Sequence, residues 1–167
     1  MNKARLFVAL AAVIGIGSAM ALEAVPNRLA TAKAGEWASY GFPNGYTQKQ
    51  TVISREGDGA EAMVTVRIED IYENEVVQTR EISRPAGEPM TEPEIPDDPN
   101  ISVDIRQDNT EVKGKTLAAT VIVVDKDYDD EDDERSEWWI SSEIPVFGII
   151  KVVADGETRF EIVDFGE

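Results

Sequence analysis

Hydrophobic and polar residues alternate with a period of two along much of this chain, which is typical of β-strands with one buried face. The clearest run covers residues 60–69, where the polar row is broken only by Met63. Its apolar side holds Ala60, Ala62, Val64, Val66 and Ile68. The run at 101–113 alternates in the same way, whereas residues 116–125 (TLAATVIVVD) are apolar on both faces. The last pattern indicates a central strand that is covered on both sides.

Turn signals divide these runs and predict hairpin connections. They are PNG at 43–45, EGDG at 56–59, YENE at 72–75, KGK at 113–115 and ADGE at 154–157. An extended segment begins at 37–40, and about eight strands follow at 47–55, 60–69, 76–84, 101–113, 116–125, 137–141, 149–154 and 158–165. Because hairpins join antiparallel strands, the predicted sheet is antiparallel.

Residues 22–35 predict one short helix before the sheet. Pro26 suits a first helical turn, and Gly35 suits the position after a last one. The expected fold is therefore mainly β (α+β), with one short N-terminal helix and a curved antiparallel sheet that forms a half-barrel.

The curvature is expected at SEWWISSEIPVFGIIKVVADGE, residues 136–157. Pro145 cannot donate to a strand ladder, and Gly148 lets the chain bend before the next strand. Such interruptions curl a sheet. Trp138 and Trp139 are adjacent in this strand, so one should point into the curve and the other away from it.

Two segments are predicted to be loops. Residues 85–100 hold five of the eight prolines, each of which lacks an N–H and restricts the residue before it. Residues 125–135 contain the acidic tract DKDYDDEDDE and are expected to form a hairpin loop.

The first 21 residues have the pattern of a secretory signal peptide. Lys3 and Arg5 precede an apolar run, and Ala19 and Ala21 form an A-x-A-like cleavage site. The apolar run is too short and too interrupted by glycine for a membrane span. Residues 22–167 are therefore expected to be a single domain without a membrane span, located in the periplasm or secreted.

Charge and composition narrow the function. The chain has 33 acidic and 16 basic residues and a net charge of −17. Such a surface repels phosphate backbones, so we expect no nucleic-acid partner. The sequence has no histidine and no cysteine, which removes Ser-His-Asp and Cys-His nucleophile systems. We expect a protein that is not an enzyme.

The acidic tract contains the candidate metal ligands. Asp125, Asp127 and Asp129 follow one another at every second position, as at the start of a calcium loop. An EF-hand needs glycine at its sixth position and glutamate at its twelfth, where this chain has Asp130 and Ser136. A looser calcium site remains one interpretation. The other is a solvated hairpin tip held open by like charges.

Aromatic side chains supply the candidate ligand contacts. A concave face lined by aromatic groups suits an apolar ligand, although packing in the core explains the same residues. The candidates are Trp37, Tyr40, Trp138, Trp139 and Phe147.

The C-terminal part also resembles a group of uncharacterised exported bacterial proteins. The stretches concerned are VKGKTLAATVIVV, SEWWISSEIPVFGIIKV and FEIVDFGE. The matching positions are Trp139, Ser141, Glu143, Ile144, Pro145, Gly148, Ile149, Ile150, Lys151, Val163, Phe165 and Gly166. In architecture the group is similar to the lipoprotein-localisation factors, whose curved half-barrels grip acyl chains on a concave apolar face.

The expected function is therefore that of an exported binding or carrier module, with an apolar small molecule or lipid on a concave sheet face. The alternative is an acidic structural or interaction protein that binds a basic partner or calcium. A continuous apolar cavity would favour the first, and a sheet filled by its own side chains would exclude it.

Overall fold

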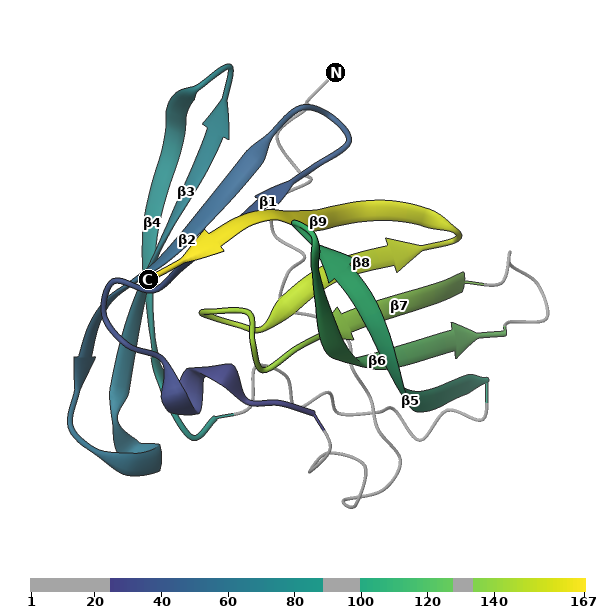
Figure 1. Cartoon of the computed structure of the whole chain (residues 1–167), viewed down its shortest axis with the longest axis horizontal. Coiled ribbons are helices and arrows are strands. Elements are labelled where there is room, and N and C mark those ends of the chain that lie inside the picture. Colours follow the sequence, from purple (N-terminus) through teal and green to yellow (C-terminus); the bar gives the residue numbers. More distant parts are fainter. Residues whose placement is uncertain (1–24, 89–99, 128–133) are drawn as a thin grey trace.

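The computed structural model describes residues 25–88, 100–127 and 134–167 (Figure 1). The signal peptide at 1–21, Asp129 and most of the proline-rich loop lie outside these ranges. Nine strands are present: β1 (Trp37–Gly41), β2 (Thr47–Glu56), β3 (Met63–Tyr72), β4 (Glu75–Pro85), β5 (Ile101–Val112), β6 (Lys115–Lys126), β7 (Glu134–Ile140), β8 (Ile149–Ala154) and β9 (Glu157–Gly166).

All nine strands belong to one antiparallel sheet with the order β4-β3-β2-β1-β9-β8-β7-β6-β5. Two runs of consecutive strands, β1–β4 and β5–β9, are joined where β1 pairs with β9. Figure 1 shows that the sheet is strongly curved. The prediction of a mainly-β protein with a curved antiparallel sheet is confirmed, and the segment at 37–41 adds a ninth strand because it pairs on both sides.

Irregular pairing accompanies the curvature. Five of the eight strand pairings contain a register shift. Such bulges bend and twist a strand locally. The shift between Trp139 and Ile140 lies directly before the segment at 141–148. The segment around Pro145 and Gly148 is a turn that joins the antiparallel strands β7 and β8, in place of the bend that was expected to curl the sheet.

The predicted N-terminal helix is wrong. The described part of residues 22–35 contains a single 3-10 turn, η1 (Arg28–Thr31), and the chain is already extended at Ala32 (φ −61°, ψ 139°). A short helix is marginal unless packing supports it, and only Leu29 of this turn is buried. A second 3-10 turn, η2 (Gly59–Glu61), lies between β2 and β3. Within the described ranges no helix is long and apolar enough to cross a membrane.

The apolar side chains of the inner, concave face form the core. The alternation in β3 holds, since Val64, Val66 and Ile68 are all buried. Strand β6 is buried on both faces from Ala119 to Val124, as its apolar run predicts.

The turn between β7 and β8 folds into this core. The amide of Ser141 donates to the carbonyl of Gly148 at 2.8 Å, which closes the turn at its neck. A Cβ on Gly148 would lie 2.9 Å from the oxygen of Ser141, so glycine is required at this close approach. Ile144, Val146 and Phe147 are buried within the turn, which makes it part of the packing and not an exposed loop.

Candidate functional site

A pocket of about 280 Å³ opens on the inner face at the ends of β6, β7 and β8. Its floor is apolar, because Trp138 lies opposite Val152 in the β7–β8 ladder and both are buried. The lining residues are Val124, Lys126, Glu134, Arg135, Ser136, Trp138, Val152, Ala154 and Asp155. Small-molecule sites are mostly apolar, whereas five of these nine lining residues are polar or charged and surround the apolar floor.

The charged groups around the pocket are bound to partners. Lys126 pairs with Glu134 at 3.0 Å. The Oδ1 of Asp155 accepts a hydrogen bond from the backbone amide of Arg135 at 3.1 Å. Its Oδ2 forms an ion pair with the guanidinium of Arg159 at 3.3 Å. The rim therefore presents opposite charges in close pairs above an apolar floor.

The structure does not bring the five predicted aromatic residues together. Trp138 lines the pocket. Tyr40 and Phe147 are packed in the core with exposed fractions of 2 % and 6 %. Trp37 and Trp139 occupy the opposite, outer face of the sheet. Each directly adjoins an inward-facing residue, Ala38 and Trp138 respectively, and successive residues of a strand point to opposite faces. One predicted residue is thus placed where a ligand could reach it.

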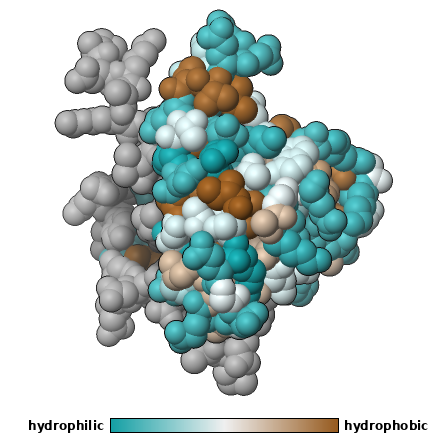
Figure 2. Space-filling view, turned by 90° about the vertical axis from the view of Figure 1, so that its left-hand side faces the viewer, coloured by the Kyte–Doolittle hydropathy of each residue, from teal (hydrophilic) through white to brown (hydrophobic). Residues whose placement is uncertain are grey.

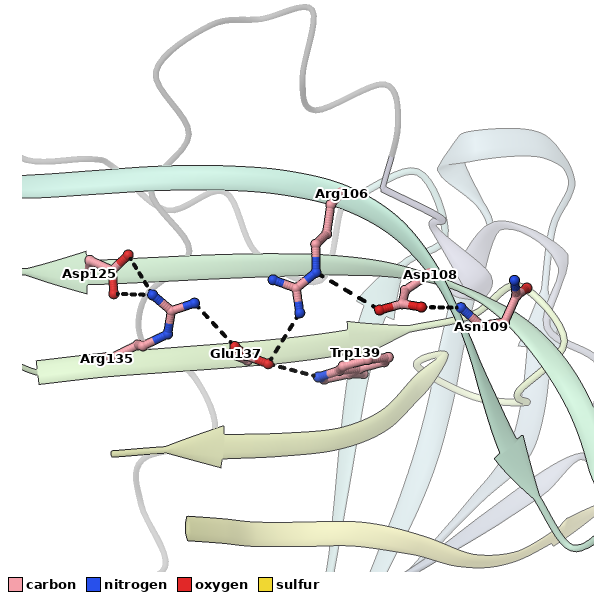
Figure 3. Close-up of polar contacts among 7 residues, drawn as sticks. All are labelled: Arg106, Asp108, Asn109, Asp125, Arg135, Glu137 and Trp139. Atoms are coloured by element: carbon pink, nitrogen blue, oxygen red, sulfur yellow. Dashed lines mark hydrogen bonds and ion pairs between the residues drawn. The ribbon is translucent and has the colours of Figure 1, made fainter. Parts of the chain in front are cut away.

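Trp139 belongs to a chain of polar contacts on the outer face (Figure 3). Its indole Nε1 donates to Glu137 at 3.3 Å, and the same carboxylate contacts Arg106 at 3.6 Å and Arg135 at 3.3 Å. The Nζ of Lys151 lies 4.2 Å from the Trp139 ring centroid. This tryptophan is therefore held by cations on the outer face and does not face the pocket.

One of the calcium candidates, Asp125, is bound to an arginine across the strand ladder. Asp125 lies opposite Arg135 in the β6–β7 pair, and the two form an ion pair at 3.0 Å. Hydrogen bonding to Glu137 and the charge of Asp125 raise the pKa of Arg135. Asp127 is exposed just after β6, and the part of the chain that the structure describes holds no group of three or more acidic side chains arranged for a metal. Calcium binding stays a prediction, and a thermal melt with and without millimolar calcium tests it.

The inner face also carries a buried polar chain that the sequence interpretation missed. Gln50 donates to Gln48 at 2.9 Å, Gln48 donates to Asp70 at 2.8 Å, and Arg80 contacts Asp70 at 3.5 Å. The sequence pattern could have indicated it, because every second residue of a strand shares one face. Gln48 and Gln50 therefore lie on the same face as the buried Val52.

Comparisons with known proteins reveal a shared fold. No protein-family model matches the chain, and no curated protein sequence does. Among solved structures, the chain is similar to a predicted exported protein with a YmcC-like fold from Bacteroides fragilis, with a TM-score of 0.53 and 9% sequence identity. The match covers 81% of this chain and 97% of that one. At this identity the likeness shows the fold alone, and membership of an exported group stays a prediction. The half-barrel shape and the resemblance to lipoprotein carriers stay predictions.

Proposed function

We propose that the mature chain is an exported binding module, without enzymatic activity, that holds one small apolar group against Trp138. The observation that carries this proposal is the pocket of about 280 Å³ with Val124, Trp138 and Val152 in its lining. Trp138 is 9 % exposed, so its ring is largely withdrawn from water and still accessible from the pocket.

The size of the pocket limits the ligand. Small-molecule sites are commonly about 300–1,000 Å³, and this pocket of about 280 Å³ is slightly smaller. A single short aliphatic chain or one ring fits such a space, whereas the several acyl chains of a lipoprotein need more. The described part of the chain therefore favours a narrower ligand class than the lipoprotein carriers handle.

The absence of reactive side chains supports a binding role. The sequence has no histidine or cysteine to act as a base or nucleophile near neutral pH. The carboxylates at the rim, those of Glu134 and Asp155, are already engaged by Lys126 and Arg159. What remains for a ligand is the apolar floor formed by Val124, Trp138 and Val152.

The experiment uses a protein in which Trp138 is the sole tryptophan, made with the substitutions Trp37→Phe and Trp139→Phe. Neutral primary alcohols of six to twelve carbons are titrated while Trp138 emission is recorded. We expect a saturable change whose apparent Kd falls about fourfold for each added methylene until the pocket is full, since burying one CH₂ contributes about 0.8 kcal/mol.

A matched pair of substitutions tests the location. Ala154→Phe fills the pocket from its lining, whereas Ala118→Phe adds the same ring at an exposed position of β6. The first should abolish the change and the second should leave it intact. A response that does not saturate, or one that survives Ala154→Phe in a folded protein, would refute the proposal.

A further inference from the structure

Strand β4 forms a long open edge of the sheet. It is the first strand in the sheet order and runs from Glu75 to Pro85. It pairs with β3 along one edge, and no other described strand pairs with its second edge. The unpaired amide and carbonyl groups of such an edge are a template for a further strand. Figure 2, viewed from this side of the molecule, shows apolar groups interrupting an otherwise polar face.

The β3–β4 hairpin also concentrates exposed apolar side chains. Five large apolar residues are exposed in the described ranges, and four of them lie on this hairpin: Met63, Tyr72, Val76 and Val77. The register shift accounts for two of them, because Ile71 pairs with Val76 while Asp70 pairs with Gln78. Val77 is thus the extra residue of a bulge, and both valines are more than half exposed.

The charge of β4 differs from that of the whole protein. The strand carries Glu75, Glu81, Arg80 and Arg84 and is neutral, although the chain has a net charge of −17. The other edge strand, β5, carries Asp104, Asp108 and Glu111 against Arg106 and is negative. A second copy of this acidic protein therefore meets the least repulsion along β4.

We propose that β4 pairs antiparallel with β4 of a second copy of this chain, around a two-fold axis at Thr79. Centring the pair on Arg80 or on Glu81 would place two like charges opposite each other, which destabilises a sheet. Centring it on Thr79 places Gln78 opposite Arg80 and Val77 opposite Glu81. The inference goes beyond ligand binding and does not depend on the pocket.

Sedimentation velocity of the mature chain at several concentrations tests the association. We expect a reversible dimer that strengthens with salt, because screening weakens the repulsion between two acidic chains. Thr79→Glu places two carboxylates at the axis and should raise the dimer Kd about fivefold. Thr158→Glu, at an exposed threonine of β9, adds the same charge elsewhere and should leave the Kd unchanged.

Crosslinking tests the register. The chain has no cysteine, so Thr79→Cys introduces a single thiol on the axis. Residues directly opposite in an antiparallel pair have Cα atoms about 4.5–5.5 Å apart, within reach of a disulfide. Oxidation should link the Thr79→Cys protein into covalent dimers and leave the Thr158→Cys protein without a covalent link, as seen on a denaturing gel without reductant. A protein that is monomeric at all concentrations, or a dimer in which Thr79→Cys does not crosslink, would overturn the proposal.

Discussion

Tyr40 combines a well-packed ring with a buried hydroxyl. Its ring meets that of Phe160 edge to face, with 5.7 Å between the centroids. The hydroxyl is buried and has no hydrogen-bond partner among the described residues. Burial raises the pKa of Tyr40 above its usual value, because desolvation disfavours the phenolate.

Removal of this hydroxyl should stabilise the protein. An unsatisfied buried polar group costs about 1–3 kcal/mol, and phenylalanine keeps the ring contact. We expect Tyr40→Phe to raise the free energy of unfolding in urea by about 1 kcal/mol. Tyr72→Phe, at an exposed tyrosine, is the control and should change little. A lower stability of Tyr40→Phe would mean that the hydroxyl is hydrogen-bonded in the folded protein.

The same residue predicts a pH dependence. The pKa of Tyr40 is raised in the folded state, so above the unfolded pKa of about 10 the unfolded chain loses this proton while the folded protein keeps it. The free energy of unfolding is therefore unaffected by the titration of this group below about pH 10 and falls as the pH rises beyond it. The free energy of unfolding should therefore fall more steeply above pH 10 in the natural protein than in Tyr40→Phe. Parallel denaturation curves at pH 9 and pH 11 measure the difference.

Val146 has a backbone conformation that valine rarely adopts. Its φ is 64°, in the left-handed region, and the side chain is fully buried in the turn between β7 and β8. Such strain costs about 1–3 kcal/mol, whereas burial of the valine contributes about 1.5–3 kcal/mol. The two effects nearly cancel, so packing is what keeps a β-branched residue here.

Substitution at this position should separate the two effects. Val146→Ala loses buried volume and keeps most of the strain, so we expect a loss of about 1–2 kcal/mol. Val146→Gly loses slightly more volume and relieves the strain. The glycine variant should therefore be at least as stable as the alanine variant in urea denaturation. The reverse order would show that the strain at Val146 is small.

At the scale of the elements, Glu137 of β7 ties its own strand to β5 on the outer face, across the intervening strand β6. Its carboxylate contacts Arg106 on β5, Arg135 on β7 and the indole of Trp139 (Figure 3). The side chain of Glu137 is 21 % exposed and those of the two arginines are 40 % and 52 % exposed. Because water screens these pairs in part, the network should contribute modestly.

Neutralising Glu137 measures that contribution. Glu137→Gln keeps an acceptor for Trp139 and removes the charge that pairs with both arginines. We expect the free energy of unfolding to fall by about 1 kcal/mol at low salt and by less at high salt. Glu161→Gln, an exposed change on β9 with the same effect on net charge, is the control. Equal effects of the two substitutions would assign the change to net charge alone.

At the scale of the whole molecule, the pairing of β1 with β9 unites the two halves of the chain. Trp37 lies opposite Gly166, and Tyr40 lies opposite Ile162. The core cluster includes residues of both halves, among them Val66 of β3 and Trp138 of β7. The two halves should therefore unfold as one cooperative unit.

Truncation tests this cooperativity. A chain that ends at Gly156 lacks β9, which removes the pairing partner of β1 and takes the buried ring of Phe160 out of the core. We expect loss of the cooperative thermal transition in circular dichroism. A chain that ends at Gly166 lacks only exposed Glu167 and should melt as the full chain does. A cooperative transition in the shorter chain would mean that one half folds without the other.

Much of this architecture could be read from the sequence. Strand positions follow from a period-two pattern that depends on near neighbours, so the predicted strands at 47–55, 101–113 and 149–154 agree closely with β2, β5 and β8. The same reasoning required Trp138 and Trp139 to face opposite sides. The helix at 22–35 failed because weak helical spacing cannot show that the residues after η1 are extended.

Contacts between distant residues were decided only by the tertiary structure. Trp138 faces inward because β7 lies between β6 and β8 in a particular register, and alternation alone does not say which side of a strand meets the core. Asp125 is tied to Arg135 across the β6–β7 pair, a contact that the spacing of the aspartates does not reveal. Likewise, β1 and β9 come from opposite ends of the chain, so their pairing depends on the folding of everything between them. Local alternation determines which residues form strands, and the order and register of the strands determine which side chains form a site.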